Sequence, residues 1–323
     1  MKTAVTDLLN IKYPIIQGGL AYLGNAELAA AVSNAGGLGQ ITAMTLFTPE
    51  KLQEEIQKVR RLTDKPFGVN FAIGSYNGVY MELLETAIKE KVKIISITGG
   101  NPQPILDRIK DENIKSLVLV STVRQAKKAE MLGASAVIAV GQEGGGHIGK
   151  DDIGTMVLIP RVAESVSIPV IASGGIGDGR GFLAALALGA QGIEMGTRFI
   201  ATAECVDAVK SYKDALVEGT EMDTVVIKRT FGTPGRVLKS DYTMNIIEKE
   251  KQGAAYEELK TIISGKSNMK FIYDGDQING FAWAGQVIGL IHDVPTVEEL
   301  IKTMVKDVIE GTERLQRLTN LQQ

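Results

Sequence analysis

The stretch IPVIASGGIGDGRGFLAALALGAQGIEMGTRF, residues 168–199, contains two strand-like runs separated by one helical pattern. The runs IPVIAS (168–173) and GIEMGT (192–197) are apolar almost throughout, as expected of strands that are buried on both faces of a parallel sheet. The segment RGFLAALALGA between them (180–190) is typical of a helix. Strands that alternate with helices predict an α/β fold with a parallel sheet.

The same alternation of strand and helix fills the first 200 residues. Six further runs are apolar and rich in β-branched residues: PIIQ (14–17), GLGQI (37–41), FGVNF (67–71), KIISIT (93–98), SLVLV (116–120) and AVIAV (136–140). Helical patterns lie between them, and Asn25, Thr48 and Pro49 stand where helix starts favour such residues. Eight strand candidates favour a (β/α)8 TIM barrel, which typically needs about 250 residues. A doubly wound open sheet is the alternative, because it uses the same alternation.

After Cys205 the pattern changes. Residues 206–275 are rich in charge and indicate helices with one short extended piece, DTVVIKRTFG (223–232). An apolar helix is predicted over FAWAGQVIGLI (281–291), followed by closing helices. We therefore expect residues 1–205 and 276–323 to form the barrel and 206–275 to form a smaller, mainly helical insertion, which acts as a lid or as a homodimer contact.

Composition excludes several classes of function. The net charge is −3 over 323 residues, without the basic stripe that nucleic-acid binding needs. No run approaches the ~20 apolar residues of a membrane span, and the start of the sequence lacks a signal-peptide pattern, so a cytoplasmic protein is expected. The single cysteine, Cys205, excludes an internal disulfide and is expected to pack in the core. No paired-histidine spacing supports a metal site.

Glycine-rich turns follow several of the predicted strands, at the end where barrels place their active sites. Examples are QGGLA (17–21), EGGGHIG (143–149), SGGIGDGRG (173–181) and MGTRF (195–199). The last two follow the seventh and eighth strands, where backbone N–H groups of such barrels often hold a phosphate. The glycine-rich run GIGDGRG (175–181) comes close to the GxGxxG dinucleotide fingerprint, but the match is weak and no acidic residue follows at the expected distance.

His147 stands directly after three glycines at the end of a predicted strand. An imidazole with a pKa near 6.5 can give or take a proton at neutral pH, so His147 is the candidate catalytic residue. The other histidine, His292, lies between two predicted helices and is expected to be structural.

The motifs PIIQGG, AGGLG, KPFGVN, GGGHIG, IPVIASGGIGDGRG, MGTRF and AWAGQVIGL together resemble the nitronate monooxygenase superfamily. That superfamily includes 2-nitropropane dioxygenase-type enzymes, the flavin-dependent enoyl-ACP reductase II and a related NADH:quinone reductase. The resemblance implies an FMN-containing TIM barrel with His147 as the catalytic residue. It also implies roles for other residues: Gly19, Leu20 and Ala21 along the flavin edge, Asn70 bonded to the flavin, Gly145 and Gly146 beside the ring, Ser173, Gly174, Gly175, Gly196 and Thr197 around the phosphate, and Trp283 and Gln286 closing the substrate pocket.

The activity that the resemblance implies first is the oxidation of alkyl nitronates with O2. Val140 stands where nitronate monooxygenases usually carry glutamine, and Gly144 where they carry alanine. GGHIGK is similar to enoyl-ACP reductase II, so an NAD(P)H-dependent reductase of enoyl-ACP or enoyl-CoA thioesters, or of quinones, is the alternative. A flavin-free phosphate-binding isomerase or lyase is a third hypothesis, but it needs a carboxylate or lysine base that no strand end supplies.

Overall fold

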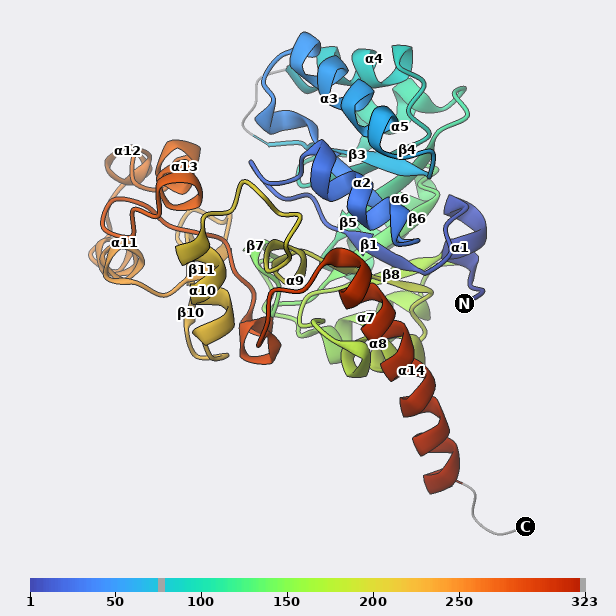
Figure 1. Cartoon of the computed structure of the whole chain (residues 1–323). Helices are drawn as coiled ribbons and strands as arrows, with labels where there is room; N and C mark the ends of the chain where they lie inside the picture. Colours follow the sequence, from blue (N-terminus) through green and yellow to red (C-terminus); the bar gives the residue numbers. More distant parts are fainter. Residues whose placement is uncertain (75–78, 320–323) are drawn as a thin grey trace.

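The computed structural model describes residues 1–74 and 79–319, and its main body is a parallel β-barrel (Figure 1). All eight predicted strands are present. They are β1 (Ile15–Gln17), β2 (Gly39–Thr42), β3 (Phe67–Ala72), β4 (Ile94–Thr98), β5 (Lys115–Val120), β6 (Ala136–Val140), β8 (Val170–Ser173) and β9 (Gly192–Met195). Their side chains are buried almost without interruption, as the apolar runs predicted.

The order of the strands shows that the sheet closes on itself. Each strand pairs in parallel with the next one along the chain from β2 to β9, and β9 pairs with β1. The remaining seam, between β1 and the start of β2, is joined by a parallel bridge between Ile16 and Leu38. There the backbone N–H of Gln17 donates to Leu38 O, and that of Leu38 donates to Ile15 O, both at 2.9 Å. The fold is therefore the predicted (β/α)8 barrel and not an open doubly wound sheet.

Helices cover the outside of the barrel (Figure 1). They are α2 (Ala26–Asn34), α3 (Pro49–Leu62), α4 (Val79–Lys89), α5 (Gln103–Ile109), α6 (Val123–Met131), α7 (Thr155–Ala163), α8 (Gly179–Ala187), the one-turn α9 (Thr197–Ile200) and the long α14 (Val297–Thr319), which packs on α8. The predicted caps are present, because Asn25 accepts from Leu28 N–H and Thr48 from Lys51 N–H. Within the two described ranges, every helix is too short or too polar to cross a membrane.

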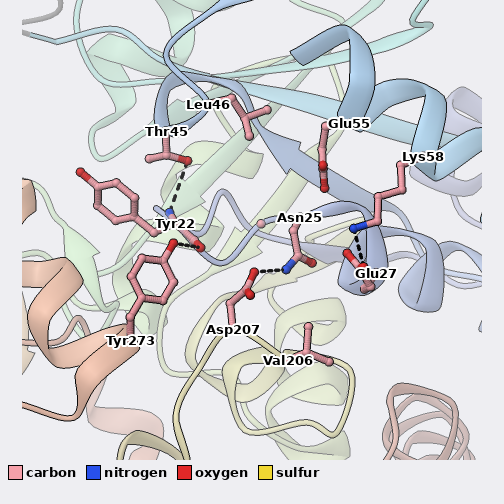
Figure 2. Close-up of a pocket in the computed structure, with 11 residues that line it drawn as sticks. Tyr22, Asn25, Glu27, Thr45, Leu46, Glu55, Lys58, Val206, Asp207 and Tyr273 are labelled. Atoms are coloured by element: carbon pink, nitrogen blue, oxygen red, sulfur yellow. Dashed lines mark hydrogen bonds and ion pairs between the residues drawn. The ribbon is translucent and has the colours of Figure 1, made fainter. Parts of the chain in front are cut away.

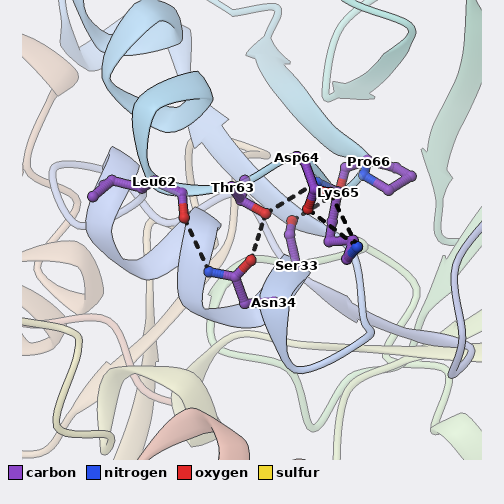
Figure 3. A network of polar contacts seen from close by, with 7 residues as sticks. All are labelled: Ser33, Asn34, Leu62, Thr63, Asp64, Lys65 and Pro66. Atoms are coloured by element: carbon purple, nitrogen blue, oxygen red, sulfur yellow. Dashed lines mark hydrogen bonds and ion pairs between the residues drawn. The ribbon is translucent and has the colours of Figure 1, made fainter.

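The amino-terminal end of the barrel is sealed. Helix α1 (Ala4–Leu9) presents Val5 and Leu9 to Ile16, Leu38 and other inward-facing strand residues, and together they form one buried apolar cluster. Beside this end, a polar network joins the ends of α2 and α3 to the start of β3 (Figure 3).

In that network, Asn34 donates to Leu62 O at 3.2 Å and accepts from the Thr63 hydroxyl at 2.6 Å. The Ser33 hydroxyl donates to Pro66 O at 2.8 Å. Carbonyl groups at this end of the barrel are therefore hydrogen-bonded within the protein, and this end is closed. The functional site must then lie at the opposite end.

Residues 206–275, called the insertion below, lie beside the carboxyl ends of the strands (Figure 1). They form α10 (Lys210–Glu218), β10 (Thr224–Ile227), β11 (Gly235–Leu238), α11 (Asp241–Lys251), α12 (Tyr256–Leu259) and α13 (Gly265–Asp274). The predicted extended piece is β10. β11 was not predicted, and it pairs antiparallel with both β10 and β7 (Gly146–His147), a two-residue strand of the barrel loop.

The prediction of a helix over residues 281–291 is wrong. The chain is extended through Trp283, which forms an isolated bridge with Val237, and only the 3₁₀ helix η2 (Gln286–Leu290) follows. The run is apolar because it is buried between β11 and the glycine loop. Leu238 N–H donates to Ala282 O, and Gln286 N–H donates to Glu143 O, each at 2.9 Å. An extended chain buried on both sides has the same composition as a buried helix.

The insertion is also tied to the barrel at a second place, a small polar cavity next to α2 and α3 (Figure 2). The Asn25 amide donates to the Asp207 carboxylate at 2.5 Å, and the Tyr273 hydroxyl donates to Tyr22 O at 3.0 Å. These contacts fix the position of the insertion over the mouth of the barrel.

Candidate active site

One large cavity opens at the carboxyl ends of the strands, between the barrel and the insertion. The predicted site residues that line it are Gly19, Leu20, Ala21, Asn70, Gly145, Gly146, His147, Ser173, Gly174, Gly175, Gly196, Thr197 and Trp283. Gln286 is not among the lining residues, and its two neighbours, Gly285 and Val287, take that place. Residue 286 is the first residue of the 3₁₀ helix η2.

Asn70, at the end of β3, is held in a single orientation. Its amide nitrogen donates to Ser96 Oγ and to Thr98 Oγ1, both at 2.9 Å, and the side chain is buried. The amide oxygen is left beside Gly19, where an added Cβ would lie 2.3 Å from it. Glycine at position 19 therefore leaves a hydrogen-bond acceptor open to the cavity.

The turns after β8 and β9 provide free backbone donors. Gly174 and Gly175 have φ of +90° and +74°, a conformation that favours glycine. Within residues 1–74 and 79–319, no hydrogen bond uses the backbone N–H groups of Gly174, Gly175, Gly196 or Thr197. Such a set of N–H groups attracts an anion.

His147 is held by the insertion. In β7 it pairs with Gly235 of β11, and its ring lies 5.1 Å from the ring of Trp283. Lys228, which follows β10, places its Nζ 2.9 Å from His147 Nε2 and 5.1 Å from the centre of the Trp283 ring. The imidazole and the indole line the cavity, and the lysine packs behind them without being one of the lining residues.

Lys228 is unusual in both its backbone and its surroundings. Its φ is +63°, and only 8% of its surface is exposed. The buried carboxylate of Glu250, on α11, accepts from Lys228 N–H at 2.9 Å and from the Thr230 hydroxyl at 2.8 Å. Glu250 therefore holds the turn that places the lysine against His147.

Burial shifts the pKa of two groups that line the cavity, His147 and Glu194, and of Lys228 behind it. The His147 ring is accessible from the cavity but enclosed by protein around it. This enclosure, and next the charge of Lys228, lower the pKa of His147 from 6.5 to about 4. Burial lowers the pKa of Lys228 to about 8, against the opposing effect of Glu250. Burial alone raises the pKa of Glu194, on β9, to about 7. At pH 7 the imidazole is therefore neutral and the lysine is charged.

Several site residues were not predicted from the sequence. Lys228 and Glu250 lie in a charged segment, where lysine and glutamate normally face water, so no local signal marked them. Glu194 did carry a signal, because it is a carboxylate in an otherwise apolar strand. Tyr212, on α10, lines the cavity and donates to Trp283 O at 2.5 Å.

The structure also places the residues for which a structural role was expected. Cys205 is fully buried in the main core, and burial raises the pKa of its thiol to about 12. His292 is exposed and lies between η2 and α14, outside the cavity lining. In the described ranges, no group of three or more His, Cys, Asp or Glu side chains is placed to hold a metal ion.

The chain is similar to known proteins over nearly its whole length. The chain matches the family described as nitronate monooxygenase over residues 2–77 and 71–307. It is 33% identical to a (3aS,4S,5R,7aS)-5-hydroxy-7a-methyl-1-oxo-octahydro-1H-indene-4-carboxyl-CoA dehydrogenase of Rhodococcus jostii, with 98% of each chain covered. It is 32% identical to a probable nitronate monooxygenase of Staphylococcus saprophyticus, covering 96% of this chain and 98% of that one.

Among solved structures, FabK from Thermotoga maritima superposes with a TM-score of 0.92 at 40% sequence identity, and the match covers 98% of this chain and 99% of FabK. The likeness extends through the barrel and the insertion alike. The chain belongs to the nitronate monooxygenase family and is an oxidoreductase.

Proposed function

We propose that the cavity binds FMN and that the enzyme oxidises alkyl nitronates with O2 as the oxidant. The single observation that carries the proposal is the Lys228–His147 pair, with 2.9 Å between Nζ and Nε2, in which His147 lines the glycine-rich cavity and Lys228 lies behind it. It places a neutral imidazole beside the space where a small substrate would lie and a positive charge behind that imidazole.

The donors and acceptors of the cavity suit FMN. The unused N–H groups after β8 and β9, with the hydroxyls of Ser173 and Thr197, suit its phosphate. Asn70 presents an acceptor for a ring N–H, and Gly146, which lines the cavity and where an added Cβ would meet none of the described atoms within 4 Å, leaves room for the flat ring. When bound, the flavin accepts electrons from the substrate and delivers them to O2.

The charges of the site favour a substrate that is already an anion. Below the pKa of Lys228, near 8, its ammonium group attracts the negative charge of a nitronate. His147, whose pKa is near 4, is a weak base and does little to remove a proton from a neutral nitroalkane. We therefore assign His147 to orienting and stabilising the bound nitronate.

A reductase of enoyl thioesters is the second candidate, and a specific observation favours it. The chain is 40% identical to FabK, and another relative is named a carboxyl-CoA dehydrogenase. In that reaction NAD(P)H would supply the electrons and bound FMN would carry them, while His147, with the charge of Lys228 behind it, would stabilise negative charge that develops on the thioester carbonyl oxygen. A quinone would use the same groups on its carbonyl oxygens.

Two assays on one FMN-loaded preparation test the proposal. Oxygen uptake is measured with an alkyl nitronate and with the corresponding neutral nitroalkane, and NAD(P)H oxidation is measured with an enoyl thioester and with a quinone. We expect rapid oxygen uptake with the nitronate and much slower uptake with the neutral form. Activity only in the NAD(P)H assay would replace the proposal with the reductase. A protein that cannot be loaded with FMN would contradict both.

The variant His147→Ala tests the role of the imidazole. We expect kcat/KM to fall by about 10²-fold or more, while the flavin spectrum and stoichiometry stay unchanged. His292→Ala is the matched control, since that histidine is exposed and outside the cavity. Normal turnover in His147→Ala would remove His147 from the mechanism.

A further inference from the structure

Lys228 combines two features that are costly to the fold. Its backbone has a positive φ of +63°, which residues other than glycine rarely adopt. Its ammonium group is buried, with 8% of the residue exposed. Strain and a buried charge at one residue, beside the candidate catalytic side chain, indicate a function rather than a structural need.

The contacts around Lys228 fix its Nζ. Glu250 accepts from its backbone N–H at 2.9 Å and anchors the following residues through Thr230. The Trp283 ring lies 5.1 Å from Nζ, and His147 Nε2 lies 2.9 Å from it. Because Trp283 also contacts the imidazole, the lysine and the histidine are packed against one shared surface.

The other charged groups near this pair are directed elsewhere. The Glu143 carboxylate accepts from Thr155 N–H and its hydroxyl at 2.9–3.1 Å. The Arg236 guanidinium donates to Gln142 O at 3.0 Å. Glu194 is on the barrel wall, where its carboxyl lies beside Gly18. Lys228 is therefore the charged partner of His147 in the described part of the chain.

We propose that Lys228 is a positioning residue for His147: its ammonium group donates a hydrogen to Nε2 and holds the imidazole as the neutral tautomer that carries its proton on Nδ1. An ammonium group has only donors to offer, so Nε2 must be the acceptor while Lys228 is charged. The charge of Lys228 also lowers the pKa of His147, in addition to the effect of burial. This proposal rests on the role that we assign to His147 in the proposed function.

One consequence concerns the insertion. His147 belongs to the barrel, but its tautomer and charge are set from β10 and α11. The insertion is then a part of the active site and supplies its positive charge. The imidazole acts as a donor through Nδ1 and does not act as a base at Nε2 while Lys228 is protonated.

The chain allows a direct test, because it contains only two histidines. The FMN-loaded protein labelled with [15N]histidine gives two imidazole spin systems, and the variant His292→Gln assigns them. At pH 7 we expect His147 to show a protonated Nδ1 and an unprotonated Nε2. In Lys228→Met we expect the Nε2–H tautomer to become populated and the pKa of His147 to rise by about one unit. Lys260→Met, which removes an exposed lysine of the insertion, is the control and leaves both properties unchanged.

Two results would overturn the proposal. One is a proton on Nε2 of His147 in the native protein at pH 7, which can be seen even if Lys228→Met does not fold. The other is a folded Lys228→Met variant whose His147 keeps the native tautomer and pKa. No substrate enters these measurements, so a failure of nitronate oxidation would leave their outcome intact and would be recognised separately.

Discussion

At the scale of single residues, Gly19 shows how the absence of a side chain prepares a binding group. A methyl group at position 19 would lie 2.3 Å from Asn70 Oδ1. Asn70 would have to turn away and would lose its bonds to Ser96 and Thr98, each worth roughly 1 kcal/mol. We therefore expect Gly19→Ala to bind FMN at least about tenfold more weakly, the equivalent of ~1.4 kcal/mol.

Fluorescence titration of the flavin-free protein with FMN measures this loss. Gly74→Ala is the matched control, because a Cβ at that glycine meets no atom of residues 1–74 and 79–319 within 4 Å. Equal affinity of the Gly19→Ala variant and the native protein would show that Asn70 does not bond the flavin.

At the scale of elements, the sequence correctly predicted the strands and helix starts whose local residue pattern is compatible with only one type of secondary structure. The eight barrel strands are continuous apolar runs between helices, and Asn25 and Thr48 do cap their helices. Segment 281–291 was mistaken for a helix because burial on both sides gives an extended chain the same composition. β11 was missed because four residues are too short for a periodic pattern, and its partners β7 and β10 are far apart in the sequence.

The turn after β10 supports a prediction about the insertion. Glu250, on α11, accepts hydrogen bonds from Lys228 and Thr230, and it is buried. Glu250→Ala leaves the buried N–H of Lys228 without an acceptor, so we expect a loss of about 1–3 kcal/mol of stability. Glu248→Ala, an exposed position on the same helix, should change the stability by less than about 0.5 kcal/mol. Thermal melting of the two variants compares them, and equal melting temperatures would show that Glu250 does not hold this turn.

At the scale of the whole molecule, closure of the barrel was the part that local patterns could not decide. An open sheet and a barrel share the same strands, and the difference is the single seam between Ile16 and Leu38. The count of eight strands predicted it correctly. The glycine turns and His147 could be placed together because a barrel brings all strand ends to one face. Lys228 could not be placed with them, since it lies in the segment 206–275, far along the chain from the strand ends.

The buried acids and bases of that face make stability depend on pH in opposing ways. Glu194 has a pKa of about 7 in the folded protein against 4.5 in its ordinary state. Between these values the unfolded chain releases a proton that the folded protein keeps, so the folded state loses stability as the pH rises from 4.5 to 7. The loss amounts to about 3 kcal/mol and stays constant above pH 7. His147 has a lowered pKa and acts in reverse, losing stability as the pH falls from 6.5 to 4.

Glu194→Gln separates the two effects, because His147 is the same in both proteins and its contribution cancels. The glutamine variant has no proton to release, so we expect its stability relative to the native protein to be higher at pH 8 than at pH 5, by up to about 3 kcal/mol. Urea unfolding of the flavin-free proteins at the two pH values measures this difference. Glu248→Gln, at an exposed position, should show none. The stability difference between Glu194→Gln and the native protein could instead be the same at pH 8 and at pH 5. That result would mean that the Glu194 carboxyl is solvated or paired in the cavity, and that its burial does not govern its charge.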